Sequence, residues 1–294
     1  MIRLVQTNTL ARGAAPKVIV PVVQRAFLSG TAFRGDDAIT PPVDTIGAQV
    51  AVLTGGDRGL ANNIAEALCD VHLKALVIFD VLKEPGDDSV AKLSSQVGIP
   101  VVFRQVDVRD QASVQEAVNA TIKQFRLIDV LVAAGRIADS NLPAETYDVA
   151  MFRRLLDINL TGTFICSQAV GAAMITARTG GSMIFITWIR GHVVNWPQQQ
   201  SCYNASKAGV IRLGKSLAAE WAHHNIRVKS ISPGYMDIAL NRVRALDAQN
   251  LLWKERTPMG AVDELNNLVV FLSSDASTYM IGTDIIIDSG YTAW

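Results

Sequence analysis

From Ala48 onward, short continuous apolar runs alternate with longer segments in which apolar residues recur at helical spacing. The runs predict strands at 48–54, 75–79, 100–106, 128–132, 182–187, 226–231 and 284–287. The longer segments predict helices at 60–72, 87–97, 112–125, 145–178, 203–223 and 264–273. Strands that are apolar without alternation are covered on both faces. Repeated units of this kind predict an α/β fold: a single Rossmann-type, doubly wound parallel sheet with helices on both faces.

The first 47 residues lack this alternation. They contain no acid before Asp36, and their basic residues are Arg3, Arg12, Lys17, Arg25 and Arg34. A basic, threonine-bearing and acid-free start is typical of a mitochondrial transit peptide. The apolar run 18–23 contains Pro21 and forms no amphipathic helical pattern, which favours a poorly ordered extension. We therefore divide the chain into an extension, 1–47, and one domain, 48–294, and expect a cytoplasmic protein, with mitochondrial import as the alternative.

Composition excludes several classes of protein. The 294 residues are 49% hydrophobic, and 27 Lys and Arg balance 27 Asp and Glu. This balance leaves no charge excess for nucleic acid, and no uninterrupted apolar run approaches the ~18 residues of a membrane span. Cys69, Cys166 and Cys202 are far apart and form neither a zinc-binding pair nor a disulfide framework. We expect a small-molecule substrate and no metal, nucleic acid or membrane.

A glycine-rich turn follows the first predicted strand. Gly55 and Gly59 allow a tight turn there and let a diphosphate approach the N-terminus of the next helix. Asp80 ends the second strand, where a carboxylate accepts the hydroxyls of an adenosine ribose and repels a 2′-phosphate, which slightly favours NAD. Arg58 favours NADP, because a guanidinium in this loop could hold the 2′-phosphate. The residues leave this choice open.

Tyr203 and Lys207 are four residues apart in a predicted helix, so their side chains share a face. A phenol titrates near pH ~10, and a fixed ammonium nearby lowers that pKa. Such a pair can exchange a proton with an alcohol or a carbonyl. A Tyr and a Lys at this spacing also flank ordinary surface helices, so the other motifs decide the interpretation.

Together the motifs resemble, in order and spacing, the short-chain dehydrogenase/reductase family. The matching segments are Thr54–Ala61, Asp80, Asp107-Val108, Asn159 in 159–164, Tyr203-x-x-x-Lys207 and Ser232–Gly234. The resemblance covers about Gly47 to Trp294. Further stretches, including Gly191-His192, are most similar to fungal polyol dehydrogenases of the mannitol, arabinitol and sorbose type.

The resemblance implies catalytic roles for three side chains. Tyr203 would donate or accept the proton, and Lys207 would lower the pKa of that phenol and hold the nicotinamide ribose. Asn159, in the long predicted helix, would fix a water that relays protons to Lys207. A helix-interior asparagine is otherwise unfavourable, which supports a functional interpretation.

The resemblance also implies the surroundings of the reaction. Residues expected to bind NAD(P)(H) are Gly55, Arg58, Gly59, Leu60, Asp80, Asp107, Val108, Ala134, Tyr203, Lys207, Met236 and Ile238. Trp188 and His192 are expected at the substrate, and the segment 233–262 would form a lid over it. The apolar helix 145–178 favours a homodimer or homotetramer.

The chain departs from the family pattern at the nicotinamide end. The serine that the family places after the fifth strand falls on Trp188, or on Arg190 when counted back from the tyrosine, and an indole offers one donor and no acceptor. Thr187 is adjacent, but successive strand residues point to opposite faces, so a twist would be needed to bring it to the site. The usual Asn-Asn-Ala-Gly is shortened to Ala133–Gly135, and Ile238 replaces a threonine.

Two hypotheses follow. The first is an NAD(P)-dependent oxidoreductase acting on a secondary alcohol or ketone, with a polyol-like or biosynthetic tailoring substrate. The second is a divergent member that binds nucleotide or another ligand without standard hydride transfer. The retained Tyr203, Lys207 and Asn159 favour the first hypothesis, whereas Trp188, Ile238 and the missing asparagine of the segment Ala133–Gly135 favour the second.

Overall fold

The computed structural model describes residues 48–56, 59–71, 73–139, 142–194, 197–238 and 257–293. The expected extension 1–47, Arg58 and the central part of the expected lid, 239–256, lie outside these described residues.

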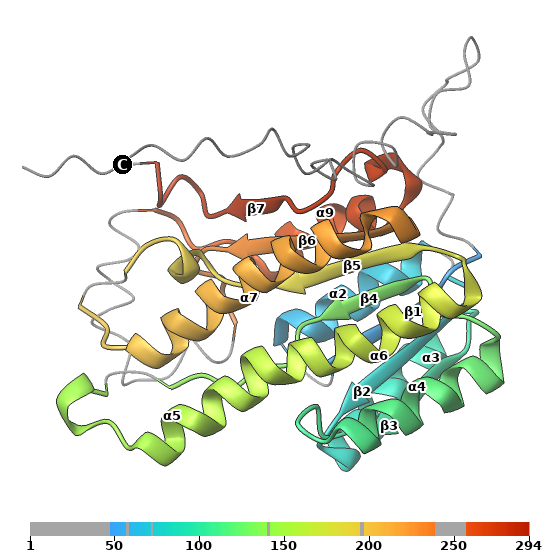
Figure 1. Cartoon of the computed structure of the whole chain (residues 1–294), viewed down its shortest axis with the longest axis horizontal. Helices are drawn as coiled ribbons and strands as arrows, with labels where there is room; N and C mark the ends of the chain where they lie inside the picture. Colours follow the sequence, from blue (N-terminus) through green and yellow to red (C-terminus); the bar gives the residue numbers. More distant parts are fainter. Residues whose placement is uncertain are drawn as a thin grey trace, which may run out of the picture.

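A parallel sheet forms the centre of the molecule, with strand order β3-β2-β1-β4-β5-β6-β7 (Figure 1). The strands are β1 (Val50–Thr54), β2 (Ala75–Asp80), β3 (Val101–Gln105), β4 (Val130–Ala133), β5 (Gly181–Ile186), β6 (Ile226–Pro233) and β7 (Asp284–Ile287). Strands β1, β2, β4 and β6 are buried along their whole length, which explains the largely apolar sequences of β1, β2 and β4. Strand β6 differs, because it buries Arg227 and Lys229, whose side chains donate hydrogen bonds to carbonyl groups at the end of α9. The predicted doubly wound α/β fold is confirmed.

Helices cover both faces of the sheet (Figure 1). The helices of one face, which share one apolar cluster, are α2 (Gly59–Asp70), α3 (Lys83–Gln96) and α9 (Asn266–Ser273). Those of the other face are α4 (Gln111–Phe125), α6 (Gly162–Ala177) and α7 (Ser201–Trp221). Side chains of neighbouring residues divide between the faces as strand geometry requires: Leu131 joins the α4, α6 and α7 cluster, whereas Val132 joins the opposite one.

The long helix expected over 145–178 is divided in the structure. Residues Ala144–Thr146 form a separate 3₁₀ turn, and α5 (Val149–Leu156) begins where the Asp148 carboxylate accepts a hydrogen bond from the N–H of Ala150. A π-helical turn, Asp157–Thr161, then joins α5 to α6. Neither the separate 3₁₀ turn nor the π-helical turn was predicted, because apolar residues continue at helical spacing through both segments.

The helix Val149–Ala177 is long and apolar enough to cross a membrane by length and composition. In the fold its α6 part packs Cys166, Val170 and Met174 into the core on one face of the sheet. Its composition is therefore that of a helix with one buried side.

The other boundaries differ from the predictions by a few residues. Helix α3 starts four residues before the expected Asp87, and α9 is preceded by a 3₁₀ turn at Val262–Leu265. Strand β7 has the expected limits.

The strand order reverses between β1 and β4, which opens a crevice at the carboxyl ends of these strands. The loops that follow the two strands touch there. Gly55 has a φ of 74°, and a Cβ at this position would lie 2.6 Å from the Cα of Gly135. The Thr54 hydroxyl also accepts hydrogen bonds from the N–H groups of Ala134 (3.1 Å) and Gly135 (3.0 Å). Glycine at both positions is what allows this contact.

Candidate active site

Residues expected to hold the diphosphate lie at the start of α2. Gly59 has a φ of 62°, and a Cβ there would meet no atom within 4 Å, so open space adjoins the first turn of the helix. The free N–H groups and dipole of a helix N-terminus favour an anion in such a space. Leu60 is buried behind this turn and packs into the core. The geometry fits a dinucleotide, with the diphosphate beside Gly59.

Asp80 ends β2 at the same edge of the sheet. One carboxylate oxygen accepts a hydrogen bond from the N–H of Leu82 (3.1 Å), which fixes the side chain at the strand end. The expected contact of this carboxylate with ribose hydroxyls is compatible with this position. Arg58, the competing determinant of nucleotide choice, is outside the described residues.

Asp107 and Val108 follow β3. The Asp107 carboxylate is paired with Arg109 at 2.6 Å, and these hydrogen bonds hold its pKa below the usual range. Val108 packs against Gly162, where a Cβ would lie 2.6 Å from the valine side chain. Asp107 therefore has a local partner, and its expected position beside an adenine stays a prediction.

Tyr203 and Lys207 lie on the first two turns of α7 and are both buried. The Lys207 Nζ is 5.7 Å from the centre of the Tyr203 ring and donates a hydrogen bond to the carbonyl of Ile186 (2.9 Å) at the end of β5. Burial raises the pKa of Tyr203, while the nearby Arg136 and Arg190 oppose that rise. Burial, followed by the charge of Arg136, lowers the pKa of Lys207 to about 7.

Asn159 lies in the π-helical turn between α5 and α6. Its Oδ1 accepts from the N–H of Ile137 (2.9 Å), and its Nδ2 donates to the carbonyl of Ile137 (3.0 Å) and to Ser206 Oγ (3.1 Å). It thus ties the loop after β4 to α7 beside the catalytic pair. Ser206 was not identified from the sequence, because the bond joins residues 47 positions apart.

Trp188 follows β5 and is one of the two residues, with Arg190, at which the family serine was expected. It is 6% exposed, and its indole Nε1 is buried without a hydrogen-bond partner in the part of the chain that the structure describes. Thr187 cannot replace the serine, since its hydroxyl donates to the carbonyl of Ile231 (2.7 Å) and contacts Ser232 Oγ (2.7 Å). The alternative in which a twist brings Thr187 to the site is therefore wrong.

A small cavity of about 30 Å³ lies against the Tyr203 ring. Most of the residues that line it carry hydrogen-bond donors: Arg136, Trp188, Arg190, Gln198, Gln200 and Tyr203, with Ala138. Arg190 is buried, donates to Gln200 Oε1 and to the Tyr235 hydroxyl (3.2 Å), and lies over the Tyr235 ring. Arg136, in the shortened turn after β4, was not singled out from the sequence.

The structure places His192 away from this cavity. Its Nε2 lies 2.6 Å from the Asp284 carboxylate on β7 and 3.3 Å from Ser232 Oγ, and Ser232 also bonds to Asp284. His192 is not among the residues that line the cavity beside Tyr203. His192 bridges the loop after β5 and the edge strand β7, and its expected contact with substrate stays a prediction.

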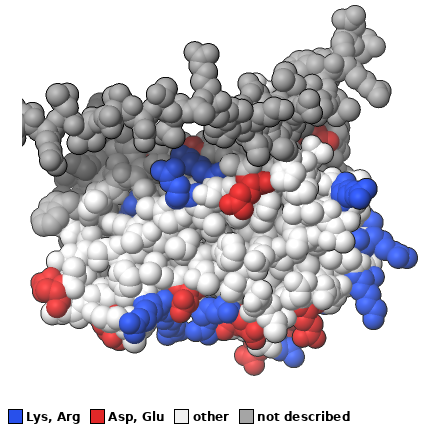
Figure 2. All heavy atoms as spheres, in the orientation of Figure 1, with Lys and Arg blue, Asp and Glu red and all other residues white. Residues whose placement is uncertain are grey.

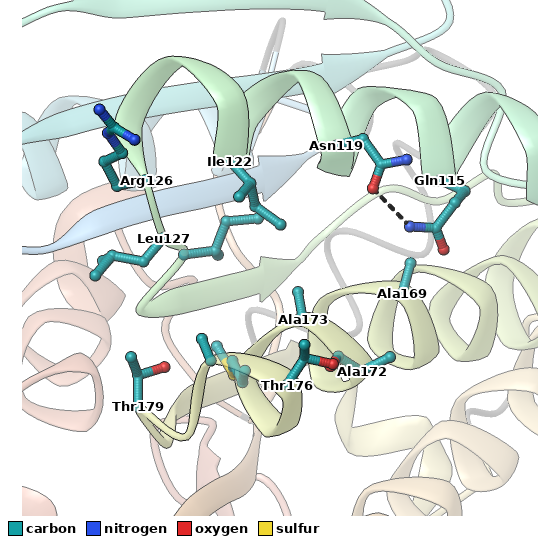
Figure 3. A pocket seen from close by; sticks show the side chains of 13 residues that line it. Gln115, Asn119, Ile122, Arg126, Leu127, Ala169, Ala172, Ala173, Thr176 and Thr179 are labelled. Carbon is teal, nitrogen blue, oxygen red and sulfur yellow. Dashed lines mark hydrogen bonds between the residues drawn. The ribbon is translucent and has the colours of Figure 1, made fainter.

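A larger hollow lies elsewhere, between α4 and α6. Figure 3 shows this groove, of about 320 Å³, with Gln115, Asn119 and Ile122 on one wall and alanines of α6 on the other. Gln115 donates to Asn119 across one helical turn (3.0 Å). None of the catalytic candidates lines it, so size does not identify the reactive site here.

Similarity to known proteins agrees with the geometry. A family model described as enoyl-(acyl carrier protein) reductase matches residues 55–292. The chain belongs to the short-chain dehydrogenase/reductase family. It is 35% identical over 249 residues to the NADP-dependent mannitol dehydrogenase of Alternaria alternata, covering 83% of this chain and 92% of the relative. It is 35% identical over 250 residues to the galactitol 2-dehydrogenase of Rhizobium johnstonii, covering 83% and 95%.

Among solved structures, that of a protein called gox2181 superposes with a TM-score of 0.81 at 34% identity, covering 86% of this chain and 98% of the other. The relatives in this family are named dehydrogenases and reductases, which supports an oxidoreductase with a nicotinamide cofactor. A nicotinamide bound beside Tyr203 would supply or accept the hydride. The chain itself provides the buried phenol, the lysine that anchors to β5, and the asparagine that holds the adjoining loop.

Proposed function

We propose that the protein interconverts a secondary alcohol and a ketone on a polyol-type substrate, with NAD(H) or NADP(H). The observation that carries this proposal is the convergence of Tyr203, Lys207 and Asn159 at the end of the dinucleotide crevice. The relatives named mannitol and galactitol dehydrogenases support the substrate class.

In this proposal Tyr203 exchanges the proton with the substrate oxygen. Burial lowers the pKa of Lys207 to about 7, so near neutral pH this side chain can take up or release a proton close to the phenol. Arg136 and Arg190 favour the phenolate when the phenol has lost its proton. The test is calorimetry with both nucleotides, followed by assays on a panel of alcohols and ketones.

The retained tyrosine and lysine do not by themselves require hydride transfer. Because Trp188 replaces the serine that the family places at the reacting oxygen, a divergent activity is the second candidate. Nucleotide binding without any nicotinamide-dependent turnover across the panel would favour it.

Asp80→Ala should shift nucleotide preference toward NADP(H). Removing the carboxylate deletes an acceptor for the ribose hydroxyls and the charge that repels a 2′-phosphate. The measurement is the ratio of NAD to NADP dissociation constants, with Asp70→Ala at the exposed end of α2 as a control. An unchanged ratio in Asp80→Ala would contradict the assignment. A wild-type preference for NADP above about tenfold, ~1.4 kcal/mol, would instead favour Arg58 as the determinant.

We expect a closed homo-oligomer, a dimer or a tetramer. Helix α6 has no charged residue and exposes Phe164, and Figure 2 shows a broad band without Lys, Arg, Asp or Glu across this side of the molecule. Phe164→Glu should dissociate the oligomer, since it would place a charge in the contact. Light scattering at micromolar concentration measures this, with Ser94→Glu on the opposite face as a control. A monomeric wild type would contradict the expectation.

A further inference from the structure

Arg136 differs from the other arginines that the structure describes. It is partly buried, yet it forms no hydrogen bond or ion pair with any described residue. The remaining described arginines either are exposed or have partners, as Arg190 has in Gln200 and Tyr235. A partly buried guanidinium without a protein partner keeps its donors available to a ligand, and departures of this kind gather at functional sites.

The charged groups around Arg136 leave its guanidinium without an ion-pair partner among the described residues. It lines the cavity beside Tyr203, and its charge acts on the buried Lys207. Asp139 is the nearby acid, but both of its carboxylate oxygens are buried without a hydrogen-bond partner, so it does not form an ion pair with Arg136. Arg136 and Arg190 therefore bring positive charge to the cavity, and Arg136 has no ion-pair partner among the described residues.

Trp188 adds an independent observation on the same wall. Its Nε1 is a donor that is buried with no acceptor, on a side chain that is 6% exposed. An indole offers no acceptor in return, and a guanidinium offers none either. The Arg136 guanidinium and the Trp188 indole N–H thus line one small cavity, and neither has an acceptor among the described residues. A ligand group that accepts hydrogen bonds and carries negative charge would satisfy both donors.

We propose, building on the function proposed above, that Arg136 and Trp188 bind a carboxylate of the substrate, so that the preferred substrate is a hydroxy or oxo acid rather than a neutral polyol. The planar fork of a guanidinium matches a carboxylate in two parallel hydrogen bonds. The cavity volume of about 30 Å³ suits a compact group rather than a second sugar ring. The carboxylate would hold the acid so that a neighbouring hydroxyl or ketone lies against the Tyr203 phenol.

The test compares D-gluconate with D-glucitol, which have the same carbon chain and differ at C1 in carboxylate or hydroxymethyl. With saturating nucleotide, wild-type kcat/KM should favour the acid at least tenfold. Arg136→Gln should reduce that ratio at least tenfold, mainly through KM, and Arg136→Lys should restore part of it. Trp188→Phe, which keeps the aromatic wall and removes the N–H, should lower the ratio severalfold. Arg212→Gln, an exposed arginine of α7, should leave it unchanged.

A binding measurement separates this inference from the proposed function. If no turnover is found on any substrate, the proposed function fails, and calorimetry with D-gluconate, D-glucitol and inorganic phosphate still tests the site. Binding of gluconate that is lost in Arg136→Gln supports the carboxylate site. Equal binding of gluconate and glucitol, or tighter binding of phosphate, overturns it. A loss of nucleotide affinity in Arg136→Gln also overturns it, because the arginine would then serve the cofactor.

Discussion

Replacing Tyr203 with Phe should reduce turnover of every alcohol or ketone substrate by about 10²–10⁴-fold. The substitution removes the hydroxyl that exchanges the proton and keeps the ring, which packs with Trp188 and Ile189 in a buried cluster. Nucleotide affinity and the melting temperature should stay close to those of the wild type. The measurement is kcat on the best substrate of the panel, together with calorimetry of the nucleotide.

A matched control removes a phenol hydroxyl away from the site. Tyr279 is 89% exposed, so Tyr279→Phe should retain full turnover. If Tyr203→Phe retains more than about a tenth of the wild-type rate, another group carries the proton, because a positioned acid contributes at least ~10²-fold. Asp139, buried close enough to raise the pKa of Tyr203, would be the next residue to test.

Trp188→Ser should raise turnover of small neutral polyols and ketoses at least tenfold. A donor aimed at the developing charge on a reacting oxygen is typically worth ~10²–10³-fold in rate. Serine would place a hydroxyl after β5, where the family has one, and would open the space that the indole fills. The measurement is kcat and KM on small and bulky substrates in parallel.

Trp188→Phe is the control for this prediction, because it removes the indole N–H and keeps an aromatic ring in the space after β5. It should remain slow on small neutral substrates. If Trp188→Ser lowers turnover on every substrate tried, the indole has a role of its own, such as stacking on a large flat substrate, and the argument from the missing serine is wrong.

Continuous apolar strands made the fold predictable from the sequence. Residues such as Val52 and Val77 are fully buried because helices cover both faces, and that burial is what the sequence pattern records. The spacing of Tyr203 and Lys207 likewise determined their shared helix face. These predictions depend only on residues that are close together in the sequence, so they do not require knowledge of how distant segments pack.

Contacts between distant segments could not be predicted in this way. His192 and Asp284 are separated by 92 positions, and their approach depends on how β7 pairs with β6. Nothing in the local sequence marks Arg136, because most residues that line the cavity with it are some fifty or more positions further along the chain. The π-helical turn at Asn159 also leaves no mark in the apolar spacing. Side-chain partners, unlike strands, are set by the assembled fold.

The contact between the loops at Gly55 and Gly135 couples cofactor choice to substrate choice. The loop after β1 carries the expected nucleotide site, and the loop after β4 continues directly into Arg136 at the cavity proposed for the substrate. Since the hydroxyl of Thr54 holds the second loop, a shift of either backbone moves the other. Cofactor choice and substrate choice are therefore not independent traits in this protein. Changes that alter one by moving these backbones are constrained to preserve the other, whether they arise in evolution or by design.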